Sequence, residues 1–334
     1  MCFYEDRIKS SNSRKELSLE EIEQISLKMP PFNWLQISGG EPFLRSDLDK
    51  ICGCFINNSR AKIISIPTNG YYVDKICDLT RRMVTSYPKI FFTIGISIYG
   101  PKNLHDKITG IPGSFDKAIS AYWKLKELAK RHSNLGLNFG ICQNKQNEDS
   151  LNELFSYLMT ECSPDHISLL FARGIDVKHK FTGTSYQKYK ENWDYLLTHV
   201  LKRDKYYYLL PFKSILYSVN MLQKDITYEV AYNEKFVLPC YAARISGVID
   251  ENGDVFSCEM RKAKLGSLRD SEYDFRNIWK GEVAKRERTQ IRKSKCYCTH
   301  ECFITSNIVF NPLMYYRLFK KWLIYNHNFD AGKR

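Results

Sequence analysis

Two features common in other protein classes are missing from this 334-residue sequence. It contains no run of about 18 uninterrupted apolar residues, so no membrane-spanning helix is expected. Its first residues, MCFYED, match neither a signal peptide nor a transit peptide. Together these absences predict a cytoplasmic protein.

Acidic residues are also in short supply relative to basic ones. The 37 aspartates and glutamates stand against 50 lysines and arginines, which gives a formal net charge of +13. Such a charge attracts nucleic acid, anionic lipid or an acidic peptide. Because the basic residues are scattered along the chain, they favour a solvated basic surface over a dedicated nucleic-acid groove.

Cysteine, in contrast, is plentiful. Eleven cysteines are many for a chain in a reducing compartment, where disulfides are disfavoured, so clustered thiols are better interpreted as ligands of a metal or an iron–sulfur cluster. Five others are spaced too irregularly to form a cage and are expected to act as small buried hydrophobic side chains. These five are Cys52, Cys54, Cys77, Cys142 and Cys162.

The first half of the chain alternates between strand and helix patterns. Ser18 and Glu21 form a capping box, and Leu17 and Ile22 a hydrophobic staple, which together predict a helix over residues 18–30. Further helices are expected over residues 47–56, 72–84, 115–131 and 151–160, and strands over 34–37, 62–66, 90–98, 135–142 and 166–171. Repeated βα units predict an α/β fold of parallel strands wrapped by helices.

The residues of chemical interest follow the expected strands. In such a fold the loops after the strands converge at one edge, where ligands bind. Gly39 and Gly40 follow the first strand and offer bare backbone to a small ligand. In the same loop, Glu41 offers charge and Pro42 stiffens the exit.

With these motifs in this order, the sequence resembles the radical S-adenosylmethionine (radical SAM) enzymes. The matching segments are SGGEP at 38–42, IPTNG at 66–70, SIYGP at 97–101, HDKITG at 105–110 and PGSF at 112–115. The resemblance implies a partial (β/α)6 TIM-like barrel, with Gly39 to Pro42 on the methionyl amino group of S-adenosylmethionine. The candidates that it gives for contacts with the rest of this cofactor are Asn69, Ser97, Asn138 and Arg173.

The resemblance also implies a 4Fe-4S cluster, of which Cys2 would be one ligand. In this family a Cys-x3-Cys-x2-Cys loop leaves one iron open for S-adenosylmethionine, whose reductive cleavage gives a 5′-deoxyadenosyl radical that abstracts hydrogen. Cys2 matches the last cysteine of that loop, and the other two would lie before Met1. We therefore expect that the sequence begins inside the motif and lacks the first barrel strand, so the activity of the chain as given depends on those cysteines.

A second group of thiols lies near the carboxyl end. Cys240 and Cys258 flank residues 248–256, which predict a β-hairpin that would bring the two thiols together. Cys296, Cys298 and Cys302 follow about 40 residues later. From spacing alone, this hairpin and knuckle would serve either structural zinc or an iron–sulfur cluster.

The spacing Cys-x12-Gly-x4-Cys, followed by LGSL at 265–268, resembles the SPASM or twitch extensions of radical SAM enzymes. That resemblance implies an auxiliary 4Fe-4S cluster, and one cluster rather than two because only five cysteines are available. Cys240, Cys258 and Cys302 are its expected ligands. Cys296 and Cys298 compete for the fourth place, because a one-residue gap seldom lets both thiolates meet the same cluster.

Four parts are expected along the chain: a barrel over 1–180, a helical bridge over 181–235, an auxiliary-cluster domain over 236–303 and an amphipathic helix within 304–334. Asn311 and Pro312 suit the start of that last helix, as its N-cap and first helical residue. The helix is apolar, aromatic and basic, so it would lie on an anionic membrane, bind a partner or pack on its own domain. Packing is favoured.

The leading functional hypothesis is a radical SAM enzyme that acts on a peptide, a protein or a small biosynthetic molecule. Its reductant would be a protein such as flavodoxin or ferredoxin, as the resemblance implies. A second hypothesis is a non-catalytic descendant that keeps the metal site as a scaffold. A third, a protein that binds or modifies nucleic acid, rests only on the positive charge.

Overall fold

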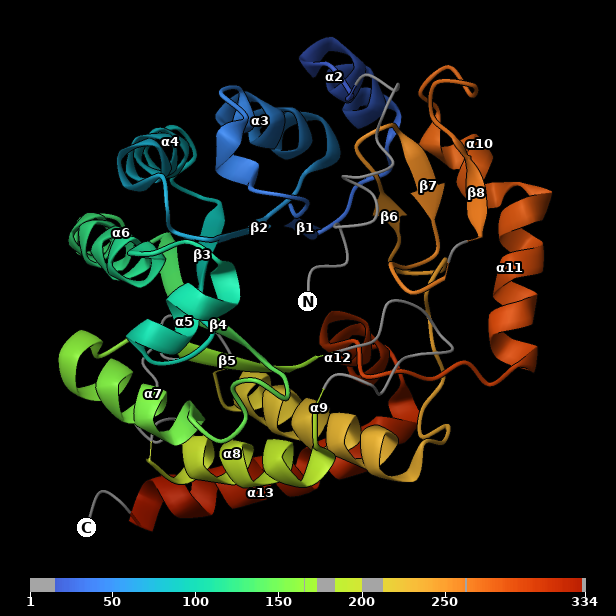
Figure 1. Ribbon diagram of the computed structural model, residues 1–334. Helices are drawn as coiled ribbons and strands as arrows, with labels where there is room; N and C mark the ends of the chain where they lie inside the picture. The colour runs from blue at the N-terminus through green and yellow to red at the C-terminus, as the bar shows by residue number, and fades with distance from the viewer. Residues whose placement is uncertain (1–15, 165, 173–183, 200–212, 262, 332–334) are drawn as a thin grey trace.

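Five parallel strands form a curled sheet in the computed structural model, which describes residues 16–164, 166–172, 184–199, 213–261 and 263–331. The strands are β1 (Trp34–Gln36), β2 (Ile63–Thr68), β3 (Phe91–Ser97), β4 (Leu135–Gln143) and β5 (His166–Phe171). They pair in sequence order, each parallel to the next. This half-barrel confirms the expected partial TIM-like fold (Figure 1).

Helices cover the convex side of the sheet (Figure 1). They are α2 (Leu19–Lys28), α3 (Leu48–Ser59), α4 (Val73–Ser86), α6 (Ser114–Ala129) and α7 (Leu151–Tyr157), which continues as a π-helical turn over Leu158–Cys162. Each matches an expected helix to within a few residues. The short helix α5 (Lys102–Thr109) was not expected, because its segment follows Pro101 and Gly100 and resembled a loop.

The two faces of the sheet differ in chemistry because side chains alternate along a strand. The convex face carries large apolar residues such as Ile66, Ile94 and Phe139, which are fully buried against the helices in one core cluster. The concave face carries small or polar residues at the alternate positions, including Ser65 and Asn138, which are half-buried. The sheet therefore presents a polar inner surface toward the mouth of the half-barrel.

A three-stranded antiparallel sheet forms the extension, from β6 (Val248–Ile249), β7 (Asp254–Phe256) and β8 (Lys264–Ser267). The expected hairpin is present, and its turn is fixed by Asp250, whose Oδ1 accepts hydrogen bonds from the backbone N–H of Asn252 at 3.0 Å and of Asp254 at 2.9 Å. Helices α10 (Phe275–Lys280) and α11 (Glu282–Lys293) follow the sheet.

The extension and the barrel share a hydrophobic core. Ile25 of α2 and Ile51 of α3 belong to the same buried cluster as Val255 and Leu268 of the extension. The capping box of α2 also points there, because Glu21 caps Ser18 and accepts hydrogen bonds from the Arg269 guanidinium at 2.7 and 2.9 Å. The extension is therefore packed as part of the same structure rather than tethered to it.

A layer of helices lies beneath the half-barrel and the extension (Figure 1). Its members are α8 (Tyr186–His199), α9 (Lys213–Asn233), α12 (Glu301–Val309), the 3-10 turn Pro312–Met314 and α13 (Tyr315–Ala331). The predicted cap is confirmed, since Asn311 Oδ1 accepts a hydrogen bond from Leu313 N at 3.1 Å. The helix α13 packs along α9, as favoured from the sequence.

A buried ion pair closes the outer edge of β5, the last strand of the sheet. Lys224 of α9 donates a hydrogen bond to the carbonyl oxygen of Leu169, and Glu301 of α12 accepts one from the N–H of Phe171 at 2.9 Å. The Lys224 ammonium lies 3.9 Å from the Glu301 carboxylate. Together the two side chains satisfy edge groups that a neighbouring strand would otherwise bind.

Candidate functional site

The glycine loop at the end of β1 leaves backbone open at the mouth of the half-barrel. Gly39 has φ of +129°, a conformation that favours glycine, and a Cβ atom added at Gly39 or Gly40 would meet no atom within 4 Å. A ligand can therefore approach the main-chain groups of both residues directly. This open backbone fits the amino-acid part of a small cofactor.

Glu41 ties this loop to the next one. Its carboxylate accepts hydrogen bonds from Phe43 N at 3.2 Å, Thr68 Oγ1 at 2.9 Å and Asn69 N at 2.7 Å. Burial raises the pKa of Glu41 above its usual value, while these three donors oppose that effect. The sequence suggested that Glu41 would offer charge to a ligand; in the structure, its oxygens hold the loops after β1 and β2 together.

Of the other predicted cofactor contacts, Asn69 and Ser97 lie at the same edge, whereas Asn138 lies inside the sheet. Asn69 is exposed after β2, and its Oδ1 accepts a hydrogen bond from Tyr71 N at 2.8 Å, which orients the side-chain amide. Ser97 ends β3, and Asn138 lies within β4 with Nδ2 at 3.3 Å from Ser168 Oγ on β5. Arg173 and Cys2 lie outside the described residues.

The inner surface adds polar groups that reasoning from motifs missed. Trp34 Nε1 donates a hydrogen bond to Ser65 Oγ at 2.9 Å, and Thr93 Oγ1 donates to the same oxygen at 2.8 Å. Asn138 and Ser168 continue this row across β4 and β5. Alternation along each strand was the signal that could have revealed them, because these residues occupy the positions between the large apolar ones.

His105 and Asp106 serve the structure of the barrel. Asp106 accepts hydrogen bonds from Gly113 N at 2.7 Å and Phe115 N at 2.9 Å, which fixes the start of α6. His105 is buried and accepts a hydrogen bond from Tyr99 N at 3.1 Å through Nδ1, and burial lowers its pKa.

Four thiols line one small pocket between the extension sheet, α11 and α12. They belong to Cys240, Cys258, Cys296 and Cys298. Both members of the Cys-x-Cys pair reach this pocket, whereas the sequence suggested that only one would. Burial raises the pKa of the Cys258 thiol and of the Cys298 thiol to about 12, so both are protonated until a metal displaces their protons.

Backbone N–H groups already point at the pocket sulfurs. Cys258 accepts hydrogen bonds from the backbone of Met260 and Arg261, and Cys298 accepts one from the backbone of His300. Cys240 accepts one from the backbone of Ala242. Each of these bonds favours the thiolate, which is the form that ligates iron.

Two side chains complete this ring of donors. The amide of Asn307 hydrogen-bonds to Cys240, and it is oriented by Tyr241 N, which donates to Asn307 Oδ1 at 2.8 Å. The Arg261 guanidinium hydrogen-bonds to Cys296 and pairs with the buried Glu287 carboxylate. The pocket therefore carries positive charge and N–H groups where an anionic cluster would lie.

The pocket offers four thiols as a ligand set, which either zinc or an iron–sulfur cluster accepts. Thiolates on one zinc ion lie roughly 3.8 Å apart, as follows from Zn–S bonds of about 2.3 Å in a tetrahedron. Within the part of the chain that the structure describes, no three Cys, His, Asp or Glu side chains are grouped closely enough for one metal ion. The four cysteines line a common pocket, and cysteine thiolates are the usual ligands of an iron–sulfur cluster.

A family model for SPASM, an iron–sulfur cluster-binding domain, matches residues 240–303, the segment that contains the pocket cysteines. Pre-heme d1 synthase from Dinoroseobacter shibae is 25% identical over 315 residues, which are 86% of this chain and 72% of that protein. Mycofactocin maturase MftC from Mycolicibacterium smegmatis is 25% identical over 300 residues, 84% of this chain and 67% of that protein.

Solved structures show the same fold. The chain aligns with native anSMEcpe with bound AdoMet at a TM-score of 0.52 and 15% identity, over 82% of this chain and 73% of the other. The chain is therefore similar to radical SAM enzymes over most of its length, and its extension matches the SPASM family. The radical SAM resemblance of the half-barrel and the SPASM resemblance of the extension are both confirmed, and the extension is an iron–sulfur cluster-binding domain.

A shorter match limits what transfers to this chain. Fe-coproporphyrin III synthase from Methanosarcina barkeri is 30% identical over 152 residues, 45% of this chain. The chain spans only 35% of the length of that protein. No helix among the described residues is long and apolar enough to cross a membrane.

Cys302 lies apart from the other four cysteines of the SPASM segment. It is not among the described residues that line the pocket, and its thiol interacts electrostatically with Lys224, the buried lysine at the edge of β5. The sequence grouped Cys302 with Cys240 and Cys258. Its assignment as a cluster ligand stays a prediction from the sequence.

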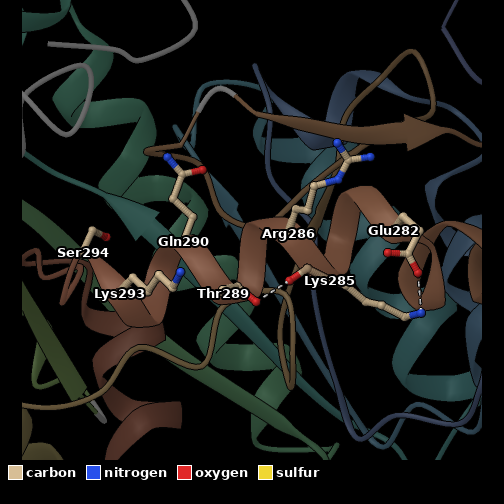
Figure 2. Close-up of a pocket in the computed structure, with 7 residues that line it drawn as sticks. All are labelled: Glu282, Lys285, Arg286, Thr289, Gln290, Lys293 and Ser294. Carbon is tan, nitrogen blue, oxygen red and sulfur yellow. Dashed lines mark hydrogen bonds and ion pairs between the residues drawn. The ribbon is translucent and has the colours of Figure 1, made fainter.

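An open hollow elsewhere on the SPASM extension is a less suitable site. Figure 2 shows its described lining, which comes from the solvent face of α11 and includes Arg286 and Gln290. Lys285 is paired there with Glu282 at 2.5 Å. The hollow has no thiol and no buried polar group among these residues, so it is better explained as a solvated helix surface.

Proposed function

We propose that this protein is a radical SAM enzyme that cleaves S-adenosylmethionine reductively and removes a hydrogen atom from a peptide, a protein or a small biosynthetic molecule. The observation that carries the proposal is the presence of two different cofactor sites in one chain. The glycine loop opens at the carboxyl ends of parallel strands, and the four-thiol pocket lies in the extension packed beside them.

At the mouth of the half-barrel, the residues of the chain bind and orient the cofactor. The backbone of Gly39 and Gly40 receives the methionyl amino group, and Glu41 fixes that backbone by holding the loop after β2. Ser97 and Asn138 offer polar groups for the rest of the molecule. Arg173, which follows β5, is proposed for the same purpose from its position in the sequence.

When bound together with a reduced 4Fe-4S cluster, S-adenosylmethionine supplies a 5′-deoxyadenosyl radical. Cys2 is proposed as one ligand of that cluster. The polar concave face of the sheet positions the substrate beside the cofactor.

The proposed substrates are peptides, proteins or small biosynthetic molecules. Support comes from the relatives, since one is a mycofactocin maturase and anSMEcpe aligns in a form with bound AdoMet and Cp18Cys peptide, at a TM-score of 0.53 and 14% identity over 94% of this chain and 89% of the other. Two further relatives are synthases of tetrapyrrole-type products by name. Flavodoxin or ferredoxin is the proposed reductant.

In the extension, Cys240, Cys258, Cys296 and Cys298 are proposed to hold one auxiliary 4Fe-4S cluster. The supporting contacts are the N–H groups of Met260, Arg261 and His300, which already point at the sulfurs. This set replaces Cys302, the ligand expected from the sequence, by the second member of the Cys-x-Cys pair.

The proposal is tested by anaerobic assay of two forms of the protein, the chain as given and a completed form with two more cysteines placed ahead of Cys2 in the Cys-x3-Cys-x2-Cys spacing. Both are reconstituted with iron and sulfide, reduced with dithionite and mixed with S-adenosylmethionine. We expect 5′-deoxyadenosine from the completed form. Absence of 5′-deoxyadenosine from a completed form that contains about eight irons per chain would refute the enzymatic proposal.

A further inference from the structure

One face of the C-terminal helix α13 packs against the protein, and the opposite face is exposed. Its inner face packs on α9, where Arg317 pairs with Glu229 at 3.0 Å and Lys321 pairs with Asp225. Leu318 joins the buried cluster beneath the helix. The inner face therefore anchors α13 to the protein and fixes which side chains point outward.

The outer face of α13, with the end of α12 before it, is strongly apolar. Leu313 is 78% exposed, Tyr316 67% and Phe310 60%. Phe319 and Leu323 are also about half exposed and follow Tyr316 at helical spacing of three and seven residues, so they share its face. These five residues are called the outer face below. Single exposed apolar residues are ordinary on proteins, but five on one short segment favour an interaction surface.

Charge selects the kind of partner that this surface fits. From Cys302 to Phe329 the sequence contains no aspartate or glutamate, whereas Arg317, Lys320 and Lys321 are basic. The Lys320 ammonium lies 4.5 Å from the centre of the Tyr316 ring on the exposed side. Arg317 and Lys321 are paired with Glu229 and Asp225 of α9, so Lys320 supplies the positive charge at the border of the outer face. An apolar and aromatic surface with a lysine at its border is complementary to an anionic lipid surface.

We propose that the outer face of α13 docks this protein on an anionic membrane surface, with the helix lying in the plane of the lipid headgroups. Tyr316 and Phe319 would occupy the boundary between headgroups and acyl chains, and Lys320 would reach back to the phosphates. Since α13 has 17 residues and its inner face is engaged with α9, it binds at the surface without crossing. This docking is independent of the proposed radical chemistry.

The membrane proposal is tested by vesicle flotation of the full chain. Vesicles contain either phosphatidylcholine alone or phosphatidylcholine with about a third phosphatidylglycerol. We expect the protein to float only with the anionic vesicles, and we expect binding to weaken as salt is raised. The triple variant Tyr316→Ser, Phe319→Ser, Leu323→Ser should lose at least tenfold in vesicle affinity, and Lys320→Glu roughly tenfold.

A matched control removes exposed apolar residues elsewhere. Leu27→Ser, Leu44→Ser and Ile111→Ser change three side chains that are about as exposed and lie on other segments. This variant should float like the unchanged protein. Circular dichroism and iron content of all variants should equal those of the unchanged protein, so that a loss of flotation reports on the surface alone.

Three outcomes would overturn the docking proposal. Equal flotation with neutral and anionic vesicles would show that charge does not select the partner. Failure of the unchanged chain to float with either vesicle would show that the outer face does not bind lipid. A dimer in light scattering that the triple variant dissociates, without any flotation, would show that the outer face joins two copies of the chain.

Discussion

The mouth of the half-barrel and the cysteine pocket are built on opposite principles. At the mouth, the proposed contacts come from open backbone at Gly39 and Gly40, and one carboxylate, Glu41, holds the loops. In the pocket, four side-chain thiols face inward and N–H donors surround them. The proposed site for the small organic cofactor thus depends on the backbone conformation of a loop. The proposed site for the metal cluster depends instead on which side chains, here cysteines, line the pocket.

The largest expected effect is loss of the auxiliary cluster, and it should occur only when a cysteine that lines the pocket is replaced. Replacing Cys258 or Cys298 by alanine should remove the auxiliary cluster, lowering iron and acid-labile sulfide by about four each per chain. Cys302→Ala should keep most of the cluster, because Cys302 does not line the pocket. Iron and sulfide analysis after anaerobic reconstitution measures the difference.

Cys162→Ala is the control for this series, since Cys162 is buried in the barrel core, away from the pocket. It should retain all of its iron. If Cys302→Ala lost the cluster and Cys296→Ala kept it, the ligand set read from the pocket would be incorrect and the assignment based on sequence resemblance would stand.

The next largest effect is expected where the edge strand of the barrel, β5, contacts helices α9 and α12. Lys224→Met leaves Glu301 as a buried charge without its cationic partner and removes the bond to Leu169, so we expect a loss of about 3–5 kcal/mol in the free energy of unfolding. Denaturant melts of the apoprotein measure it. Adding Glu301→Gln should recover part of the loss, because the uncompensated charge is then gone.

The control for Lys224 is Lys124→Met, which breaks an exposed pair with Asp74 and should change stability very little. A Lys224→Met protein as stable as the unchanged chain would show that the buried pair does not hold the barrel edge to α12.

A smaller effect is expected from a substitution that changes the mouth of the half-barrel and leaves the pocket unchanged. Glu41→Gln replaces one accepting oxygen by an amide that faces the N–H donors, so it should cost about 1–3 kcal/mol and weaken binding of S-adenosylmethionine. The auxiliary cluster should load fully in this variant. Loss of iron from the SPASM pocket in Glu41→Gln would mean that the two sites are not separately built.

The smallest effect concerns pH at the contact between barrel and extension. The Arg269 guanidinium lowers the pKa of Glu21 from 4.5 to about 2. A carboxyl with a lowered pKa in the folded state stabilises the protein above its unfolded pKa, and this contribution disappears as pH falls from about 4.5 to about 2. The stability difference between the unchanged protein and Arg269→Met should therefore be present at pH 7 and shrink below pH 4.5.

Unfolding midpoints in urea at several pH values test this prediction. Lys285→Met, which affects an exposed pair within α11, serves as the comparison because it does not join the two regions. A difference for Arg269→Met that stays constant from pH 7 to pH 3 would show that Glu21 does not titrate against Arg269.

Much of the fold could be predicted from local pattern. The alternation of apolar positions gave all five strands, and the capping box at Ser18 and the cap at Asn311 located helix starts because these signals act within one turn. The spacing of the cysteines predicted a group of thiol ligands in the extension. The helix α5 was missed because its signal is short and follows Pro101.

Other features depend on contacts that spacing does not encode. The cap on β5 joins Lys224 and Glu301, which lie on different helices and far from β5 in sequence. The joint presence of Cys296 and Cys298 in the pocket depends on the path of the chain before α12. The hydrogen bonds of Glu41 to the loop after β2 required the sheet order to be known.

The most direct test of the central claim is an anaerobic calorimetric titration of S-adenosylmethionine into the completed form of the protein, with Gly40→Val as the partner variant. We predict one binding site per chain in the former and none in the latter, with equal iron content in both. Absence of binding in a fully iron-loaded completed form, or equal binding by Gly40→Val, would contradict the assignment of the glycine loop.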